Sequence, residues 1–322
     1  LSNRDDPRWQ EIPRWQKDLF WIVFTKDHIY RIPKPHSAGI MFGSLPERML
    51  EAYESDHPGA MKDLEKSFIS AFFPNMIPTV AAPIVDQFAN RSLFTGAPLI
   101  PATQEKLLPE YQYTEYTLES TKALGKIFGA FPGMRERSIH DEDTFIGGVA
   151  RALTTPILIE NYVRSWTGGL GVYALQLADK GLREAHVLPD PVKPLETLSD
   201  LPVIKAFVVR YPSASAQSIQ DFYDDYYAAK RKYDTKMLLA EQGDVDAFDR
   251  VQRIAPNAWD EAAGIRDTLT GHAQLIRLIY KNPDGTPEEK RQLIDTLYSN
   301  MINMAKIGNK SLQEMSNQLG EP

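Results

Sequence analysis

One run of the chain joins a histidine to three carboxylates, a combination that can bind a metal ion or transfer protons. His140-Asp141-Glu142-Asp143 supplies four potential ligands in succession. Side chains of adjacent residues rarely converge on one ion without help from elsewhere, and the chain has no HExxH pattern that would place two histidines on one helix face. We therefore interpret this run as a solvated loop.

A second acidic group, Asp244, Asp246 and Asp249, has part of the spacing of a calcium-binding loop. Phe248 stands at the fifth position, where an EF-hand needs an oxygen ligand, and the glycine and distal glutamate of such a loop are missing. Acidic side chains in the first turn of a helix interact favourably with the helix dipole. A helix cap explains the pattern better, and we expect no metal site.

Other signatures of chemistry are weak or missing. Gly168-Gly169-Leu170-Gly171 does not follow a predicted strand and lacks the dinucleotide-binding fingerprint, so a turn between helices explains it better. The sequence has no P-loop and no GxSxG motif. It also has no cysteine, which excludes disulfides, thiolate catalysis and cysteine-ligated metals. We predict no catalytic residue and no cofactor.

Tyrosines recur at helical spacing between residues 223 and 233, and such rings can stack on nucleic-acid bases. Asp221, Asp224 and Asp225 are interleaved with them, which works against a nucleic-acid groove. These tyrosines therefore pack either in the protein core or against a partner helix. The same two alternatives apply to the Met/Leu stripe of the last predicted helix. The predicted partner interface consists of Tyr223, Tyr226, Tyr233, Met237, Leu297, Met301 and Met304.

Composition places the chain among globular proteins. It has 322 residues, 43% of them hydrophobic and 25% charged, which suffices for one large or two ordinary domains. The net charge of -7 gives no reason to expect general binding to a phosphate backbone. No apolar run approaches the ~18–20 residues that span a bilayer. The chain begins without methionine and without a visible signal peptide, as a fragment or a processed product would.

The strongest local signal is a β-hairpin. Residues 19–24 are apolar and rich in aromatic and β-branched types, and residues 28–32 return after a polar turn. Pro33 cannot donate a ladder hydrogen bond, so we expect the second strand to be an edge. A lone hairpin is marginal in water, and we expect nearby helices to cover Trp21 and Phe24. Residues 1–18 read as an irregular arm that its tryptophans pin to a core.

Helical patterns fill most of the remaining chain. Between the hairpin and residue 212 they predict helices over residues 44–53, 56–74, 114–131, 155–166 and 170–185, with another that kinks at Pro83 or starts near Ala82. Residues 132–147 read as a charged loop. From Ser213 proline becomes scarce and long helices are predicted, with a stop at Gly243, a cap at Asp244 and a capping box at residues 286–289.

These signals predict a mainly α fold, with a short N-terminal β-hairpin packed on helices and followed by long helices that form a bundle or arm. The predicted domains are residues 1–188, a hairpin-plus-helices unit, and residues 213–322, a long-helix module. A proline-rich linker with one short helix, residues 189–212, joins them.

Several strings in the first part of the chain are distinctive. They are Asn3-Arg4-Asp5-Asp6-Pro7-Arg8-Trp9, Ile12-Pro13, Trp15-Gln16-Lys17-Asp18, Tyr30-Arg31-Ile32-Pro33-Lys34-Pro35, Phe42-Gly43-Ser44-Leu45-Pro46-Glu47-Arg48, Ile159-Glu160-Asn161-Tyr162 and Trp166-Thr167-Gly168-Gly169-Leu170-Gly171. Together they resemble a large polyvalent-protein-associated domain of bacteriophages over residues 1–185. No such resemblance covers residues 213–322.

The resemblance implies a role in a very long phage protein. Some proteins with this domain resemble the internal virion, or ejection, proteins of short-tailed phages (podoviruses). Such a chain would lie in the capsid, leave with the genome and help to form a conduit across the host periplasm and envelope. Its partners would be sister copies in a homo-oligomer and other ejection, portal or tail proteins. Genome DNA would pass nearby without specific binding, and host envelope contact is open.

The resemblance brings no established catalytic residues. Lytic transglycosylase activity, which some of these long proteins carry, would lie outside this chain. The alternative to a structural role is an enzyme or anti-defence effector delivered with phage DNA, which a pocket with converging polar residues around His140 or Arg164 would favour. A peripheral membrane contact is the third possibility, and we expect little binding because no predicted helix is strongly basic on one face and strongly apolar on the other.

Overall fold

The structure is a computed structural model that describes residues 6–35, 40–44, 46–47, 82–88, 90–92, 98–141, 144–254 and 258–319. It confirms the predicted fold class, a mainly helical chain with a small antiparallel sheet near the N-terminus followed by long helices. Most of the predicted helix over 44–53 and all of that over 56–74 lie outside the described residues. Helix α6 (Ala82–Phe88) contains Pro83 as its second residue.

The described residues form two compact units. The first draws on the described residues within 1–72, 192–199 and 206–322, and the second on those within 73–191 and 200–205. These units differ from the predicted division at residues 188 and 213. The hairpin and the short helices before it group with the long C-terminal helices, because α1 (Pro7–Glu11) packs on α12 (Gln217–Glu241).

The sheet of the first unit has three strands, in the order β1 (Phe20–Phe24), β2 (Ile29–Pro33) and β3 (Val208–Val209), each pair antiparallel. The expectation that the second strand is an edge was wrong, since β2 lies between the other two. Pro33 is nonetheless tolerated. Strand β3 is so short that it pairs only with Ile29 and Tyr30, so Pro33 at the far end of β2 faces no β3 residue.

The face of the sheet that carries Ile22 and Ile29 is buried against Ile12 and Val209. Residues 1–18 do not form an irregular arm where they are described, since α1 and α2 (Arg14–Leu19) fill most of them. Trp9 packs edge-on against Phe24, as expected of a tryptophan that holds this segment against the core. Trp21 points to the opposite face because side chains alternate along a strand. It is 47% exposed, so the expectation that helices cover it was wrong.

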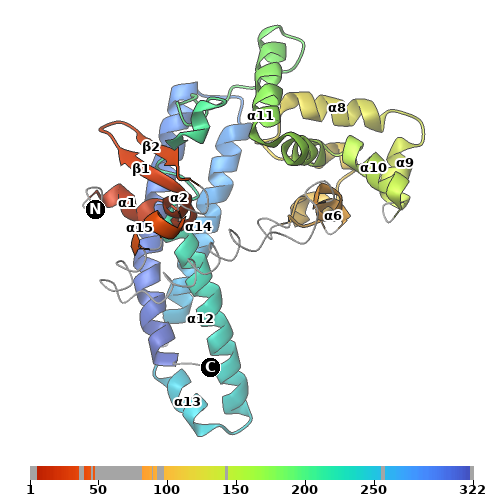
Figure 1. The fold of residues 1–322 in the computed structure, drawn as a ribbon. Helices are drawn as coiled ribbons and strands as arrows, with labels where there is room; N and C mark the ends of the chain where they lie inside the picture. Colours follow the sequence, from red (N-terminus) through yellow and green to blue (C-terminus); the bar gives the residue numbers. More distant parts are fainter. Residues whose placement is uncertain are drawn as a thin grey trace. The chain divides into compact units, whose positions relative to one another are not determined.

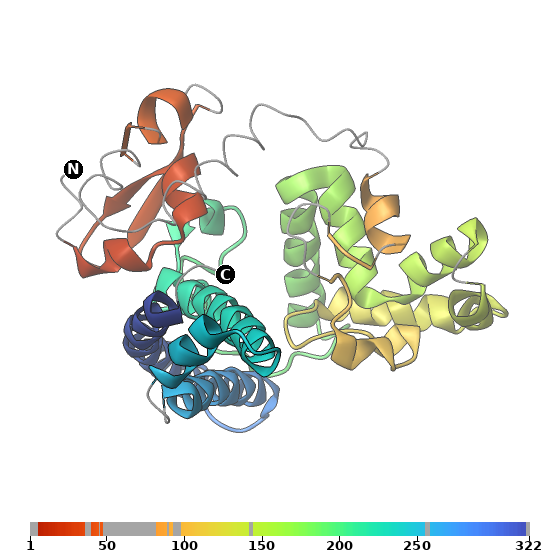
Figure 2. The same cartoon turned by 90° about the horizontal axis from the view of Figure 1, so that it is seen from below.

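Three long helices form a bundle in the first unit (Figures 1 and 2). Helix α15 (Pro287–Leu319) packs on both α12 and α14 (Ala258–Lys281), and the short α13 (Val245–Gln252) lies at one end. Phe222, Leu269, Ile294 and Leu312 are fully buried between them. The predicted caps are confirmed: Gly243 has a positive φ of 95°, Asp244 accepts a hydrogen bond from the Ala247 amide (3.0 Å), and Thr286 and Glu289 exchange two hydrogen bonds.

The proline-rich linker is partly bound to this bundle. The Lys290 ammonium donates to the carbonyl of Val192 (2.7 Å), and the Arg291 guanidinium donates to that of Leu195 (2.7 Å). The Leu195 amide donates to the carbonyl of Pro287 (2.9 Å). The short helix expected in the linker is the 3-10 turn η3 (Ile204–Ala206).

The second unit contains α6, α7 (Ala102–Glu105), the 3-10 turn η2 (Pro109–Tyr111), α8 (Glu119–Gly129), α9 (Met134–His140), α10 (Phe145–Thr154) and α11 (Pro156–Glu184). Residues 132–147 were predicted as a loop but contain α9 and the start of α10, which pack closely on each other. The predicted break near Gly168 is confirmed. Its φ of 62° and ψ of -151° kink α11 into two halves.

Candidate functional site

The predicted interface residues lie largely inside the bundle. Tyr226 and Met301 are buried in its core, and Tyr223, Leu297 and Met304 pack against the same core. Tyr233 packs against the smaller cluster around Met315 and Leu319. Met237 is the most exposed of the seven, at 36%. Of the two alternatives left open by the sequence, core packing accounts for the buried members, and contact with a partner stays a prediction.

The seven-residue spacing of Tyr226 and Tyr233 on α12 has a local explanation. The ring of Trp259 from α14 lies between them, with centroids 5.5 Å from each and interplanar angles of 11° and 12°. Such stacks add to the stability gained by burial. These tyrosines therefore join two helices of the same chain.

The structure describes part of the first acidic run and all of the second. His140 is exposed at the end of α9, and Glu142 and Asp143 lie outside the described residues. Asp244 is used as the N-cap of α13. Within the part of the chain that the structure describes, no group of three or more histidine, cysteine, aspartate or glutamate side chains is placed to hold a metal ion.

Three of the distinctive strings meet at one buried ammonium in the first unit. The Lys34 side chain is 2% exposed, and its Nζ donates to the carbonyl of Lys17 (2.8 Å) and to Ser44 Oγ (2.9 Å). Ser44 Oγ in turn donates to the carbonyl of Asp18 (2.5 Å), and Glu47 lies 3.3 Å from Nζ. A lysine beside a serine can act in catalysis. Ser44 is itself buried, however, so this cluster joins the chain segments and offers no route to a substrate.

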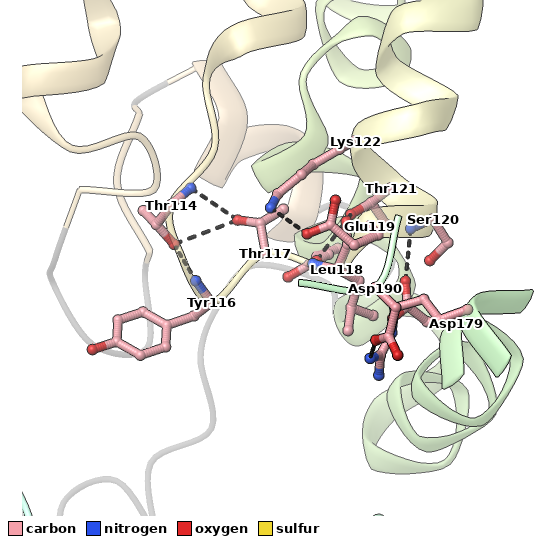
Figure 3. Close-up of polar contacts among 12 residues, drawn as sticks. Thr114, Tyr116, Thr117, Leu118, Glu119, Ser120, Thr121, Lys122, Asp179 and Asp190 are labelled. Atoms are coloured by element: carbon pink, nitrogen blue, oxygen red, sulfur yellow. Dashed lines mark hydrogen bonds and ion pairs between the residues drawn. The ribbon is translucent and has the colours of Figure 1, made fainter. Parts of the chain in front are cut away.

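In the second unit, two carboxylates from α11 meet the N-terminus of α8. Leu118, the N-cap of α8, has no side chain that can satisfy the free amides of the first turn. The Leu118 amide donates to Glu160 Oε1 (2.7 Å), and the Ser120 amide donates to Asp179 Oδ1 (2.6 Å). Figure 3 shows Asp179 pointing at Ser120, with Thr114 and Thr117 facing each other just before the helix.

The pKa values of these two carboxylates move in opposite directions. Burial raises the pKa of Glu160, although hydrogen bonds from Leu118 and the Thr121 hydroxyl oppose the shift. Burial would also raise the pKa of Asp179, but hydrogen bonds from Ser120 and from Arg183 (3.0 Å) outweigh it, and the pKa is lowered. Asp179 therefore favours its charged form more strongly than Glu160 does.

The hydrogen bonds of Glu160 and Asp179 to the Leu118 and Ser120 amides form what we call the α8 anchor. The kink in α11 creates a pocket of about 290 Å³ beside it. One half of the helix supplies Ile157, Glu160 and Arg164, and the other half supplies Val172, Leu175 and Gln176. The segment from Thr114 to Leu118, together with Leu99 and Pro101, closes the pocket. It belongs entirely to the second unit.

Polar side chains also line the pocket. Arg164 is exposed, and within the described residues no hydrogen bond or ion pair occupies its guanidinium. Lys205 Nζ donates to Gln176 Oε1 (2.6 Å). Burial lowers the pKa of Lys205, and repulsion from Arg164 lowers it further. Sequence reasoning named Arg164 as a possible centre but missed Glu160, Gln176 and Asp179 as parts of a site.

The family model described as large polyvalent protein associated domain 38 matches residues 6–204, which cover strands β1 and β2, the Lys34 cluster and the kinked helix. No curated protein and no solved structure gives a significant match. Among the described residues, no helix is long and apolar enough to cross a membrane.

Proposed function

The chain belongs to the family described as large polyvalent protein associated domain 38, a phage-associated family, and we propose from this premise that it is a structural, non-enzymatic part of a phage virion protein. In this proposal the chain is packaged inside the capsid, leaves with the genome and forms part of a conduit through the host periplasm and cell envelope. Family membership over residues 6–204 is the observation that carries it.

The exposed apolar surface of the second unit supports assembly with other chains. Along α10, Phe145 is 70% exposed and Ile146 64% exposed, and Val149 and Leu153 continue the same stripe one and two turns later. Apolar stripes of this kind mark protein–protein contact sites. In the proposal they bind sister copies or another ejection, portal or tail protein.

The net charge of -7 fits a conduit through which DNA moves. Like charges repel, so an acidic surface lets the genome pass without holding it. The bundle of α12, α14 and α15 supplies the rigid, helical part of such a structure, since its side chains are packed within the chain.

The test is to purify virions of the phage that encodes the chain and to identify tryptic peptides from both units by mass spectrometry. Infected cells are then fractionated after adsorption, before new protein is made. The proposal expects the peptides in the virion and afterwards in the envelope fraction. Peptides that occur only in the cytosol late in infection, and never in virions, would contradict it.

An enzyme or effector delivered with the DNA is the second candidate. The pocket beside Arg164 favours it, because Arg164, Glu160 and Gln176 converge there. His140, the other centre considered from the sequence, is exposed at the end of α9 and does not line this pocket. Glu160 is already engaged in holding α8, which leaves the pocket better suited to binding than to proton transfer.

A further inference from the structure

The pocket formed by the kinked α11 has an apolar wall that a structural role in the virion does not explain. Leu99, Leu118, Ile157, Val172 and Leu175 line it. Its volume of about 290 Å³ is close to the lower end of the range for small-molecule sites, which are mostly apolar with a few polar groups that fix orientation. An aliphatic group of a few carbon atoms matches this wall.

Two polar residues of the pocket lining can donate hydrogen bonds to a ligand. The guanidinium of Arg164 offers a planar fork of N–H groups that matches the two oxygens of a carboxylate. Gln176 also lines the pocket and its Oε1 accepts from Lys205, while no hydrogen bond from the described residues engages its NH₂ group, which can donate to a ligand. Lys205, whose Nζ donates to Gln176, adds positive charge to this group of side chains.

We propose that this pocket binds a monocarboxylate on an aliphatic stem, with the carboxylate on Arg164 and Gln176 and the stem against Ile157, Val172 and Leu175. The carboxylate comes either from a free aliphatic acid or from the C-terminus of a peptide. Glu160 lies in the same pocket, and its negative charge offsets one of the two cations, so a monoanion balances the remaining positive charge whereas a dianion exceeds it. A phosphate monoester is therefore a poorer ligand than a carboxylate of the same stem.

The experiment uses the full chain and ligand-observed NMR titrations at pH 7 with three probes: hexanoate, hexyl phosphate and a short acetylated peptide that ends in leucine with a free carboxylate. The amidated peptide is the control for the last. Arg164→Gln removes the charged fork, and Arg137→Gln, on an exposed residue of α9 outside the pocket, makes the same charge change elsewhere.

The expected result is saturable binding of hexanoate that weakens about tenfold or more in Arg164→Gln and is unchanged in Arg137→Gln. Hexyl phosphate should bind more weakly than hexanoate. Glu160→Gln should tighten hexanoate binding, because the repelling charge is lost while an acceptor for the Leu118 amide remains. This variant and Arg164→Lys, which should weaken binding less than Arg164→Gln, keep the test valid if Arg164→Gln does not fold.

The peptide separates the two sources. If it binds more tightly than hexanoate and its amide does not bind, the site takes a peptide C-terminus; if hexanoate binds more tightly, the site takes a free acid. Either result supports the carboxylate assignment. No saturable binding of any acid, equal affinity in wild type and in every Arg164 variant, or hexyl phosphate binding as tightly as hexanoate would overturn it.

Discussion

Replacing Gly308 of α15 by alanine tests whether the close contact between α12 and α15 fixes the bundle. A Cβ at this position would lie 2.4 Å from Cε2 and 2.7 Å from Cδ2 of Phe222, and 3.4 Å from Ile265 Cδ1. Carbon atoms prefer to lie ~3.5–4.0 Å apart, so the ring or the helix must move by about 1 Å. Phe222 is completely buried and stacks on Tyr226, which leaves it little room to move.

The expected magnitude follows from two opposing effects. Overpacking a well-filled core costs about 1–3 kcal/mol, while alanine stabilises a helix interior by about 1 kcal/mol relative to glycine. Gly308→Ala should therefore lower the free energy of unfolding by up to about 2 kcal/mol. Gly264→Ala in α14 is the matched control, because a Cβ there would meet nothing within 4 Å. It should raise the stability by up to about 1 kcal/mol.

The assay is native-state hydrogen exchange of amides in α12 and α15 over a denaturant series, because it reports the opening of this unit separately from the rest of the chain. Phe222→Leu is then combined with Gly308→Ala. Relief of the clash predicts a coupling of about 0.5–3 kcal/mol in the double-mutant cycle. Equal stability of the Gly308 and Gly264 variants, or a coupling of zero, would refute the reasoning about this contact.

Two further predictions concern the stacked tryptophan and the α8 anchor. Trp259→Ala should destabilise the bundle by about 3 kcal/mol in the same exchange assay, whereas Trp259→Phe, which keeps a ring between the two tyrosines, should cost much less. Asp179→Asn should remove stability that is present above the unfolded pKa of ~3.9 and that the wild type loses as the pH falls through the lowered folded pKa. Glu160→Gln should show the opposite trend. The stability of this variant relative to the wild type should increase as the pH rises from ~4.3 through the raised folded pKa of Glu160, because only the wild type then buries a charge. Urea unfolding of each variant and the wild type across pH 2–7 measures both, and parallel pH curves for the two variants would contradict the assigned shifts.

Features set by neighbouring residues could be predicted from the sequence. The caps at Asp244 and Thr286, the stop at Gly243 and the break at Gly168 each depend on a few adjacent residues, and all four appear in the structure. Strand β3 could not be predicted in this way. It has only two residues, and its extended form depends on pairing with Ile29 and Tyr30, which are distant in the chain.

The site was harder to predict because its parts have no local signature. Glu160 and Arg164 are four residues apart on a helix, and opposite charges at that spacing usually form a solvent-exposed pair. The missing cap could not be seen in the sequence either. The sequence predicted a helix from Thr114, but α8 has Leu118 as its N-cap, so the free amides of its first turn need an acceptor from another part of the chain. The carboxylates that accept from these amides are set by the way the two halves of α11 pack on α8. This packing is a tertiary contact, which local sequence patterns do not reveal.

Gly168 connects the anchor with the pocket, because it sets the angle between the half of α11 that carries Glu160 and the half that carries Asp179. Its φ of 62° and ψ of -151° fall in a region that is essentially restricted to glycine and costs other residues about 1–3 kcal/mol. A Cβ there would meet nothing within 4 Å, so the whole cost of Gly168→Ala is backbone strain. We expect this variant to lose protection of the Leu118 and Ser120 amides and to bind hexanoate more weakly, although Arg164 is intact. Gly181→Ala, in the same helix, with an equally open Cβ position and no positive φ, should change neither. Unchanged exchange at both amides in Gly168→Ala would mean that the kink does not hold the two halves of α11 in place.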